Sequence, residues 1–462
     1  MYEYDLIIIG AGPGGTAAAL QAAHYGKKTA IVEKAEIGGT CLNRGCIPTK
    51  ALLHASTVYS EIQSAQSLGI DCSVAGVDLP GMFAYKNRII STLAKGMEDS
   101  LKRAGIQAYY GRAEITDLHS VRICRNDGQI DSIQSERILI ATGSAPLCPP
   151  IPGLDLDGVM TSDMILEGSE NLYSSVVIIG GGVIGCEFAT FYSNLGVPVT
   201  ILEGASHLLP NMDRELGQNL ALLLKKKGVN IHTGAMVQRI EKGINGLDVV
   251  YASENDEKKI CGEKVLCAIG RRPYYDSLFS KDFPLSVSGR SIPVDENYST
   301  AIPGIYAIGD VSSRIQLAHA ASAQGIAAVD HMFGNDLPAN PQLIPSVVYC
   351  SPEIAAVGLS EKEASESGIS VVTGKAVLGA NGRALILNSG RSFMKLVANT
   401  ESHEILGAQF MCANASDIIS ELTLAIQNHI TAEKLLAVIR PHPTFEEALN
   451  GALEQLLTKL SK

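Results

Sequence analysis

The stretch LIIIGAGPGG, residues 6–15, decides the fold of the N-terminal part of this chain. Leu6–Ile9 is a short apolar run typical of a buried parallel strand, and an alanine-rich helix from Thr16 to about Tyr25 follows the glycines. A second strand, Thr29–Val32, then leads to Glu33. Strand, glycine turn, helix, strand and acid together predict a dinucleotide-binding unit, in which the acid accepts hydrogen bonds from ribose hydroxyls.

The same unit occurs a second time in VVIIGGGVIG, residues 176–185. In each copy the first glycine permits a tight turn, the second lets a pyrophosphate approach the backbone, and the last lets the helix pack closely. At a constant offset of 170 residues, the members of the first copy (Gly10, Gly12, Gly15, Gly26 and Glu33) match those of the second (Gly180, Gly182, Gly185, Gly196 and Glu203). The repetition predicts two dinucleotide-binding domains, for which a flavin and a nicotinamide are the usual pair.

The second acid indicates which nicotinamide the chain binds. Glu203 would repel a 2′-phosphate, and the residues that follow it, Gly204–His207, contain no arginine to receive one. The sequence therefore favours NAD over NADP.

A pair of cysteines lies in GGTCLNRGCIPTK, residues 38–50. In a regular helix Cys41 and Cys46 would be roughly 8 Å apart along the axis, beyond the ~4.4–6.8 Å Cα spacing of a disulfide. The segment must therefore bend, and Gly45 supplies the freedom to do so. Pro48 is typical of the first turn of a helix, whose N-terminus stabilises a thiolate. We predict a redox-active dithiol; the alternative is a pair of small buried apolar residues.

Composition excludes several classes of protein. The chain has 462 residues, of which 46% are hydrophobic, and its net charge is −11. Its one basic block, residues 225–227, is interpreted as a solvated helix end. Nucleic acid is therefore not an expected partner. Ten scattered cysteines without metal-type pairs predict neither a metal site nor a secreted disulfide scaffold. Residues 6–25 are uncharged, but their glycines and Pro13 argue against a membrane span, so we expect a cytoplasmic protein.

Strand-and-glycine patterns and prolines set the expected domain limits. The run Ile138–Gly143 and four prolines between residues 146 and 152 end a first domain, 1–150. A similar run, Val265–Pro273, ends a second domain, 151–273. A central part, 274–340, returns to the first domain. Its strand Ile305–Ile308 ends in Gly309 and Asp310, which places one carboxylate at a sheet edge; the alternative for Asp310 is a helix cap.

The last part of the chain, 341–462, has a different character. Strand-like runs are expected at 347–350, 393–397 and 405–411, and helices at about 417–428 and 431–438, with no phosphate loop. We predict an α/β protein with two Rossmann-like domains and a C-terminal α+β domain.

A histidine between two prolines completes the candidate chemistry. Pro441 and Pro443 hold His442 extended, and Thr444 can cap the helix that carries Glu447. A carboxylate near an imidazole holds its tautomer and raises its basicity. Taken alone, His442 would more often be a loop histidine with its hydrogen bonds satisfied, but a dithiol needs a base to take the proton of a substrate thiol.

The motifs together resemble one family over the whole length. GGTCLNRGCIPTKALL, GGGVIGCE, GIYAIGD, LAHAASAQG, VVYCSPEIAAVGLSEKEA, ANGRAL and HPTFEEA occur in the order found in the flavoprotein disulfide reductases. They are most similar to the members that oxidise protein-bound dihydrolipoamide with NAD. The resemblance implies that Cys41 exchanges with the substrate sulfur, that Cys46 faces the flavin, and that Lys50 pairs with Glu187 beside it.

The resemblance also implies a homodimer, in which His442 with Glu447 is the acid–base group supplied by the other subunit. The cofactors it implies are FAD and NAD, and the protein partner is a lipoylated carrier of the E2 or H-protein type. The residues expected at FAD are Gly10, Gly12, Gly14, Gly15, Glu33, Lys34, Thr40, Lys50, Thr142, Gly143, Gly309, Asp310, Ala318 and His319. The residues expected at NAD are Gly180, Gly182, Gly185, Glu187, Glu203 and Gly270.

Two alternatives stay open at this point. The chain could be another NADH-dependent flavoprotein disulfide reductase, or a flavin and nicotinamide redox sensor without turnover. Some positions depart from the family pattern without affecting the chemistry: Arg44, Thr49, Cys412–Asn414 and Arg440–Pro441.

Overall fold

The computed structural model describes residues 2–253, 256–281, 283, 285, 287, 291–334 and 343–461.

The first glycine turn connects a strand and a helix as the sequence predicts. Gly10 has a φ of +105°, and a Cβ at Gly15 would lie 1.9 Å from the carbonyl oxygen of Gly10. Only glycine lets the helix approach the strand this closely.

The first sheet has seven strands in the order β3-β2-β1-β6-β5-β4, with β17 also paired to β6. Strands β1, β2, β3 and β17 run parallel to their neighbours, whereas β4, β5 and β6 form an antiparallel meander. Its elements are β1 (Tyr4–Ile9), α1 (Pro13–His24), β2 (Thr29–Glu33), α2 (Gly39–Arg44), α3 (Cys46–Ser64), η1 (Ala65–Leu68), α4 (Leu79–Arg103), β3 (Gln107–Tyr110), β4 (Arg112–Asp117), β5 (Ser120–Cys124), β6 (Ile130–Ile140), β17 (Ile305–Ala307), η2 (Gly309–Val311) and α8 (Ala318–Met332). The chain thus returns to this sheet at β17.

The second sheet repeats the first glycine turn. Gly180 has a φ of +106°, and a Cβ at Gly185 would lie 2.0 Å from the carbonyl oxygen of Gly180. The strands are parallel in the order β11-β10-β9-β15-β8, beside an antiparallel sheet of β12, β13 and β14. Its elements are β8 (Val159–Thr161), α5 (Ser162–Ile165), β9 (Val176–Ile179), α6 (Val183–Asn194), β10 (Val199–Glu203), α7 (Arg214–Lys226), β11 (Asn230–Thr233), β12 (Met236–Gly243), β13 (Gly246–Ser253), β14 (Asp256–Gly262) and β15 (Lys264–Cys267).

Two short strands carry the chain between these domains. β7 (Ser144–Pro146) pairs antiparallel with β16 (Arg271–Pro273), so the outgoing and returning crossovers lie side by side. The proline-rich stretch that follows β7 is the expected linker. The predicted domain limits stay predictions, and the limit between residues 340 and 341 lies outside the described residues.

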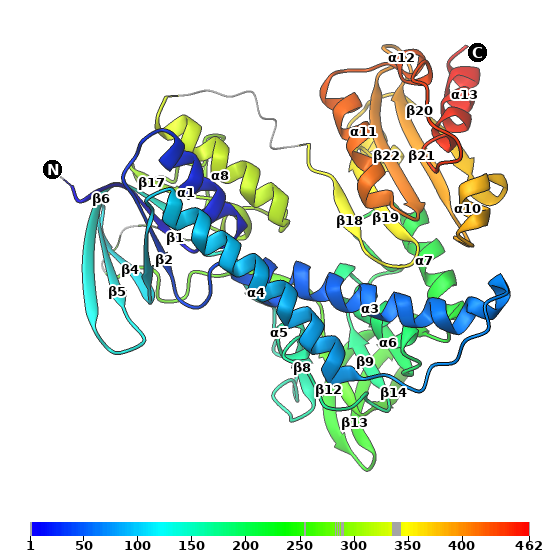
Figure 1. Ribbon diagram of the computed structural model, residues 1–462, viewed down its shortest axis with the longest axis horizontal. Helices are drawn as coiled ribbons and strands as arrows, with labels where there is room; N and C mark the ends of the chain where they lie inside the picture. The colour runs from blue at the N-terminus through cyan, green and yellow to red at the C-terminus, as the bar shows by residue number, and fades with distance from the viewer. Residues whose placement is uncertain are drawn as a thin grey trace.

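The C-terminal part is an antiparallel sheet in the order β18-β19-β22-β21-β20. Helices α11 and α13 cover one face of this sheet (Figure 1). Side chains on its other face, among them Phe393 and Met411, pack into the core around α6 (Val183–Asn194) of the second domain. Its elements are β18 (Ser346–Val348), β19 (Glu353–Gly358), α9 (Glu361–Glu366), β20 (Val371–Val377), η3 (Leu378–Ala380), α10 (Gly382–Ile386), β21 (Phe393–Asn399), β22 (Ile405–Cys412), α11 (Ala415–Gln427), α12 (Ala432–Leu436) and α13 (Ala448–Leu460). The predicted α/β class with a C-terminal α+β domain is confirmed.

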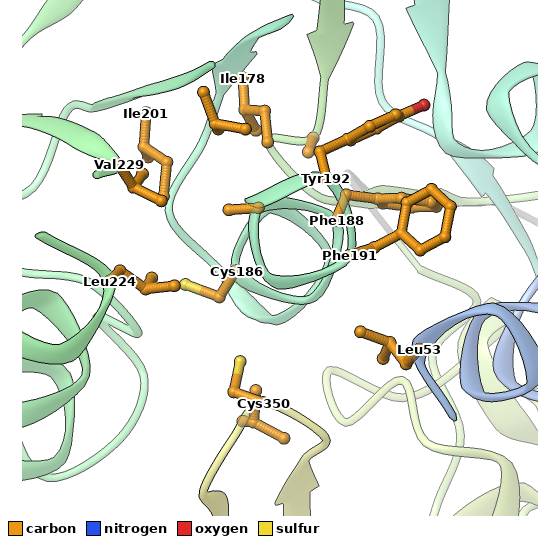
Figure 2. Close-up of a cluster of buried hydrophobic side chains, with 14 of the residues drawn as sticks. Leu53, Ile178, Cys186, Phe188, Phe191, Tyr192, Ile201, Leu224, Val229 and Cys350 are labelled. Carbon is orange, nitrogen blue, oxygen red and sulfur yellow. The ribbon is translucent and has the colours of Figure 1, made fainter. Parts of the chain in front are cut away.

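One hydrophobic core joins all three parts of the chain. Its centre is α6, where Cys186, Phe188 and their neighbours are buried. Leu53 of α3 and Cys350, which follows β18, point into the same cluster (Figure 2). Burying a side chain of this size contributes about 1.5–3 kcal/mol, so the core holds α3, α6 and the end of β18 in fixed relative positions.

Several elements were not predicted from the sequence. The antiparallel sheet β12–β14, the long helix α4 and the strands β19 and β20 lack a motif that would identify them. Glu447 lies immediately before α13 as its N-cap residue, not within the helix as expected. Within the described part of the chain, no helix is both long and apolar enough to span a bilayer.

The two glycines of the second turn give a matched test of the fold. We expect Gly185→Ala to destabilise the protein by about 1–3 kcal/mol or more, because the added methyl group would overlap the Gly180 carbonyl. Gly182→Ala is the control, since its Cβ would meet nothing within 4 Å. Urea unfolding of both variants checks this expectation. Equal loss of stability in the two variants would contradict it.

Candidate active site

The cysteine pair lies where two helices meet. Cys41 is in α2, Cys46 is the first residue of α3, and Gly45 separates the helices. A Cβ at Gly45 would come within 2.9 Å of the Thr40 carbonyl oxygen, so glycine is required for this close turn. The bend predicted at Gly45 is therefore confirmed, and it brings the two side chains into contact.

The two thiols differ in how readily they ionise. Both are free thiols. Hydrogen bonding with the Cys46 side chain, together with burial, raises the pKa of Cys41 above its usual range. Hydrogen bonding with the Cys41 side chain, with help from the charge of Lys50, outweighs burial and lowers the pKa of Cys46 to about 7. Cys46 is therefore the member of the pair that carries the negative charge near neutral pH.

Lys50 and Glu187 form an ion pair between the first and second domains. The Nζ atom of Lys50 lies 2.9 Å and 2.8 Å from the two carboxylate oxygens of Glu187. The Glu187 side chain is only 3% exposed, and its Oε1 also accepts the backbone N–H of Tyr349 at 3.0 Å. The Lys50 ammonium lies 4.8 Å from the centre of the Tyr349 ring. Burial opposes charge on Lys50, but Glu187 outweighs it and the pKa of Lys50 is raised.

The carboxylate of Glu33 binds the backbone of the first glycine turn. Glu33 accepts the backbone N–H of Ala11 at 2.8 Å and that of Ala35 at 2.9 Å. The carboxylate therefore lies directly beside the turn, with lone pairs left for a ribose. Lys34 follows it, with its ammonium 3.3 Å from the centre of the Tyr274 ring.

The second turn makes the same bonds. Glu203 accepts the backbone N–H of Gly181 at 2.5 Å and that of Ala205 at 2.6 Å. These contacts match those of Glu33 at the constant offset of 170 residues, so the repeat found in the sequence extends to individual hydrogen bonds.

Asp310 lies at the edge of the first sheet. Its carboxylate accepts a hydrogen bond from the hydroxyl of Ser144 at 2.5 Å, and the Nε of Arg271 donates to that hydroxyl at 2.8 Å. Burial raises the pKa of Asp310, while Ser144 and the charge of Arg271 partly offset it. The carboxylate is thus bonded to another side chain and is not the helix cap considered as its alternative. Sequence reasoning did not identify Ser144, Arg271 or Tyr349, because only the fold brings them to the site.

His442 and Glu447 lie apart from the cysteines in this chain. The Nδ1 atom of His442 lies 3.0 Å from Glu447 Oε2, which also accepts the backbone N–H of Thr444 at 3.1 Å. The backbone N–H of Glu447 in turn lies 3.4 Å from the Thr444 hydroxyl, a reciprocal arrangement that holds the carboxylate in place. The His442 side chain is 79% exposed and does not line the cavity that its own chain's dithiol lines.

One cavity of about 2890 Å³ connects the dithiol with both glycine turns. Among the predicted residues, His442, Glu447, Gly15 and Gly185 do not line it. The others all do: Cys41, Cys46, Lys50, Glu187, Gly10, Gly12, Gly14, Glu33, Lys34, Thr40, Thr142, Gly143, Gly309, Asp310, Ala318, His319, Gly180, Gly182, Glu203 and Gly270. Gly15 and Gly185 instead pack each helix onto its strand.

The cavity fits two dinucleotides. Gly12 and Gly182 precede the first turns of α1 and α6, and an added Cβ at either would meet nothing within 4 Å. Each helix N-terminus therefore opens onto free space suited to a pyrophosphate. Within the described part of the chain, no group of three or more His, Cys, Asp or Glu side chains could hold a metal ion.

Comparison with known proteins defines the class. The chain belongs to the pyridine nucleotide-disulphide oxidoreductases: the model of this family matches residues 4–325, and that of its dimerisation domain matches residues 344–453. This family implies FAD and NAD as cofactors, and the dimerisation domain supports a homodimer.

Several curated relatives carry the same name. A dihydrolipoyl dehydrogenase of Geobacillus stearothermophilus is 38% identical over 98% of this chain and 96% of the relative. One of Bacillus subtilis is 37% identical over 98% of this chain and 96% of the relative. Among solved structures, LpdA of Mycobacterium tuberculosis is similar with a TM-score of 0.90 and 26% identity, covering 98% of this chain and 99% of that one. The HOCl-induced flavoprotein disulfide reductase RclA of Escherichia coli has a TM-score of 0.86 and 30% identity at the same coverage.

The ionisation of the dithiol can be measured. We expect the reduced pair to lose its first proton, from Cys46, with an apparent pKa of about 7. Lys50→Met removes a positive charge that favours the thiolate, so the transition moves to higher pH, towards the usual thiol value of about 8.5. The pH dependence of iodoacetamide alkylation, read at each cysteine by mass spectrometry, checks both statements. Lys95→Met, on the exposed surface of α4, is the control. An unchanged transition in Lys50→Met would contradict the assignment.

Proposed function

We propose that this protein oxidises dihydrolipoyl groups carried by a partner protein and reduces NAD to NADH, as a dihydrolipoyl dehydrogenase. The observation that carries this proposal is the polarised dithiol of Cys41 and Cys46, in one cavity with two dinucleotide-binding turns. The names of the curated relatives support the same reaction.

The dithiol exchanges disulfides with the substrate. In the oxidised enzyme a substrate thiolate attacks the sulfur of Cys41, a new S–S bond forms, and Cys46 leaves as the thiolate. The second substrate thiolate then attacks the substrate sulfur bound to Cys41, which releases the cyclic lipoyl disulfide and the Cys41 thiolate; the latter takes back the proton held by the acid–base histidine and becomes the thiol. Two electrons have moved from the substrate to the dithiol. The lowered pKa of Cys46 makes it the better leaving group of the pair.

FAD, when bound, supplies the route by which this electron pair reaches NAD as a hydride. The protein places the two cofactors: Gly12 and Glu33 border one cradle, and Gly182 and Glu203 border the other. Lys50, held by Glu187, lines the same cavity as the dithiol and both cradles, and its charge favours the thiolate of Cys46. We propose that each of the other residues expected at FAD or NAD contacts the cofactor that the family resemblance implies for it.

We assign the proton transfers to His442 of a second subunit. Glu447 lies against its Nδ1 and leaves Nε2 free to take a proton from the substrate thiol. The exposed imidazole and the dimerisation domain support this shared site. Glu203, without a following arginine, supports NAD over NADP. Ten free cysteines support a reducing compartment, the cytoplasm.

A direct assay tests the proposed reaction. We expect the FAD-loaded protein to oxidise NADH with lipoamide as the acceptor, and to do so faster than with NADPH because Glu203 repels the 2′-phosphate. A lipoylated E2 domain and a lipoylated H-protein serve as the protein-bound substrates. Turnover of other disulfides in preference to lipoamide would instead favour a different disulfide reductase, and no turnover with any disulfide would favour a redox sensor.

Mixed dimers test the shared site. We expect Cys46→Ser and His442→Gln homodimers each to lose lipoamide turnover, by on the order of a hundredfold or more for His442→Gln. When the two chains are co-expressed in equal amounts, about half of the dimers are mixed, and one of the two sites in each mixed dimer has both residues, so activity returns to about a quarter of the wild-type value. The His442→Gln homodimer should still pass electrons from NADH to ferricyanide. Mixed dimers that stay inactive would contradict a shared site.

A further inference from the structure

The loop that carries His442 has a buried base and an exposed tip. The Arg440 side chain is only 3% exposed, whereas Ile439 beside it is 97% exposed and the His442 side chain 79% exposed. A charged side chain is rarely buried unless it is paired, so the burial of Arg440 needs an explanation.

The guanidinium of Arg440 joins three helices. Its Nη2 lies 2.6 Å from Glu421 Oε1 of α11, and its Nη1 lies 2.7 Å from Asn450 Oδ1 of α13. It also donates to the carbonyl oxygens of Leu435, in α12, and Val438, each at 3.3 Å. The planar fork of arginine can make these bonds in several directions at once, whereas the single ammonium of lysine cannot.

A second set of bonds holds the other end of the loop. The Thr444 hydroxyl donates to the carbonyl oxygen of Pro441 at 2.8 Å, and Asn381 Nδ2 donates to the carbonyl oxygen of Thr444 at 2.9 Å. Glu447 binds both the Thr444 N–H and the His442 ring. The segment from Arg440 to Glu447 is thus fixed at both ends, and only its outward side is free.

The hydrogen bonds of Arg440 are better explained by a role in positioning the loop than by a role in stabilising the folded protein. Its Nε is buried and finds no hydrogen-bond partner among the described residues, which is unfavourable for a buried donor. Buried ion pairs often add little net stability compared with apolar residues of similar size, but they restrict geometry. The arginine directly precedes the Pro441–His442–Pro443 segment, so the geometry it restricts is that of the histidine.

We propose that Arg440 is a positioning residue for the acid–base histidine: by anchoring the loop to α11, α12 and α13, it sets where the imidazole of His442 meets the dithiol of the second subunit. This inference rests on the proposed function, because it assigns Arg440 to the same site. Arg440 does not touch the substrate and acts only through His442.

The following variants distinguish a displaced His442 from a general loss of folding. Arg440→Met keeps the volume and removes the fork, and it should lower lipoamide turnover by on the order of a hundredfold, as expected for a small misplacement of a catalytic group. Electron transfer from NADH to ferricyanide, which needs no proton from His442, should stay within about twofold of wild type. Hydrogen exchange of residues 438–445 should become faster. Arg440→Lys should recover part of the lipoamide turnover.

Arg391→Met is the matched control, because Arg391 is an exposed arginine of the same domain with a single bond to Asn219 at 2.8 Å. It should leave both reactions and the exchange of residues 438–445 unchanged. The proposal is overturned if Arg440→Met keeps lipoamide turnover, or if it loses both electron-transfer reactions equally. If wild-type protein does not reduce lipoamide at all, the proposed function fails. Hydrogen exchange of residues 438–445 in Arg440→Met and Arg440→Lys then still decides whether Arg440 orders the loop. Should Arg440→Met not fold, Glu421→Leu removes the acceptor on α11 and breaks the same anchor from the other side, with the same expected split between lipoamide and ferricyanide as electron acceptors.

Discussion

The ion pair of Lys50 and Glu187 is the constraint on which the arrangement of the site depends. Its two members come from different dinucleotide-binding units, and a backbone N–H of the C-terminal domain, from Tyr349, binds the same carboxylate. A carboxylate that is only 3% exposed requires such partners, since an unpaired buried charge is strongly destabilising. Leu53 and Cys350, close in sequence to Lys50 and Tyr349, are buried in one core around α6. The packing of three domains therefore determines where one ammonium group lies.

The position of that ammonium matters because it polarises two otherwise equivalent thiols. Cys41 and Cys46 are the same residue type, but their interaction raises the pKa of Cys41 and lowers that of Cys46, and Lys50 adds a positive charge that favours the thiolate of Cys46. A thiolate leaves a disulfide more readily than a thiol of higher pKa, so the difference between the two groups gives the exchange its direction. The chemistry thus follows from geometry that the fold imposes on a short turn.

The sequence allowed much of this structure to be predicted. The two glycine turns, their acids, the bend at Gly45 and the α/β class follow from local patterns, because each requires particular residues at fixed spacing. Ser144, Arg271 and Tyr349 could not be predicted as site residues, since their contacts depend on how distant segments meet. The antiparallel sheet β12–β14 also has no distinctive motif. The meeting of His442 with the cysteines stays a prediction, because it requires a second subunit.

The matched bonds of Glu33 and Glu203 have a consequence for how such a protein acquires two cofactors. Each carboxylate accepts the corresponding pair of backbone N–H groups in its own turn, and this shared geometry contains nothing that distinguishes FAD from NAD. Whether a nucleotide is retained as a prosthetic group or exchanges as a co-substrate must therefore depend on the residues that line each site outside the turn. A duplicated fold of this kind can diversify in ligand without altering the turn that holds it.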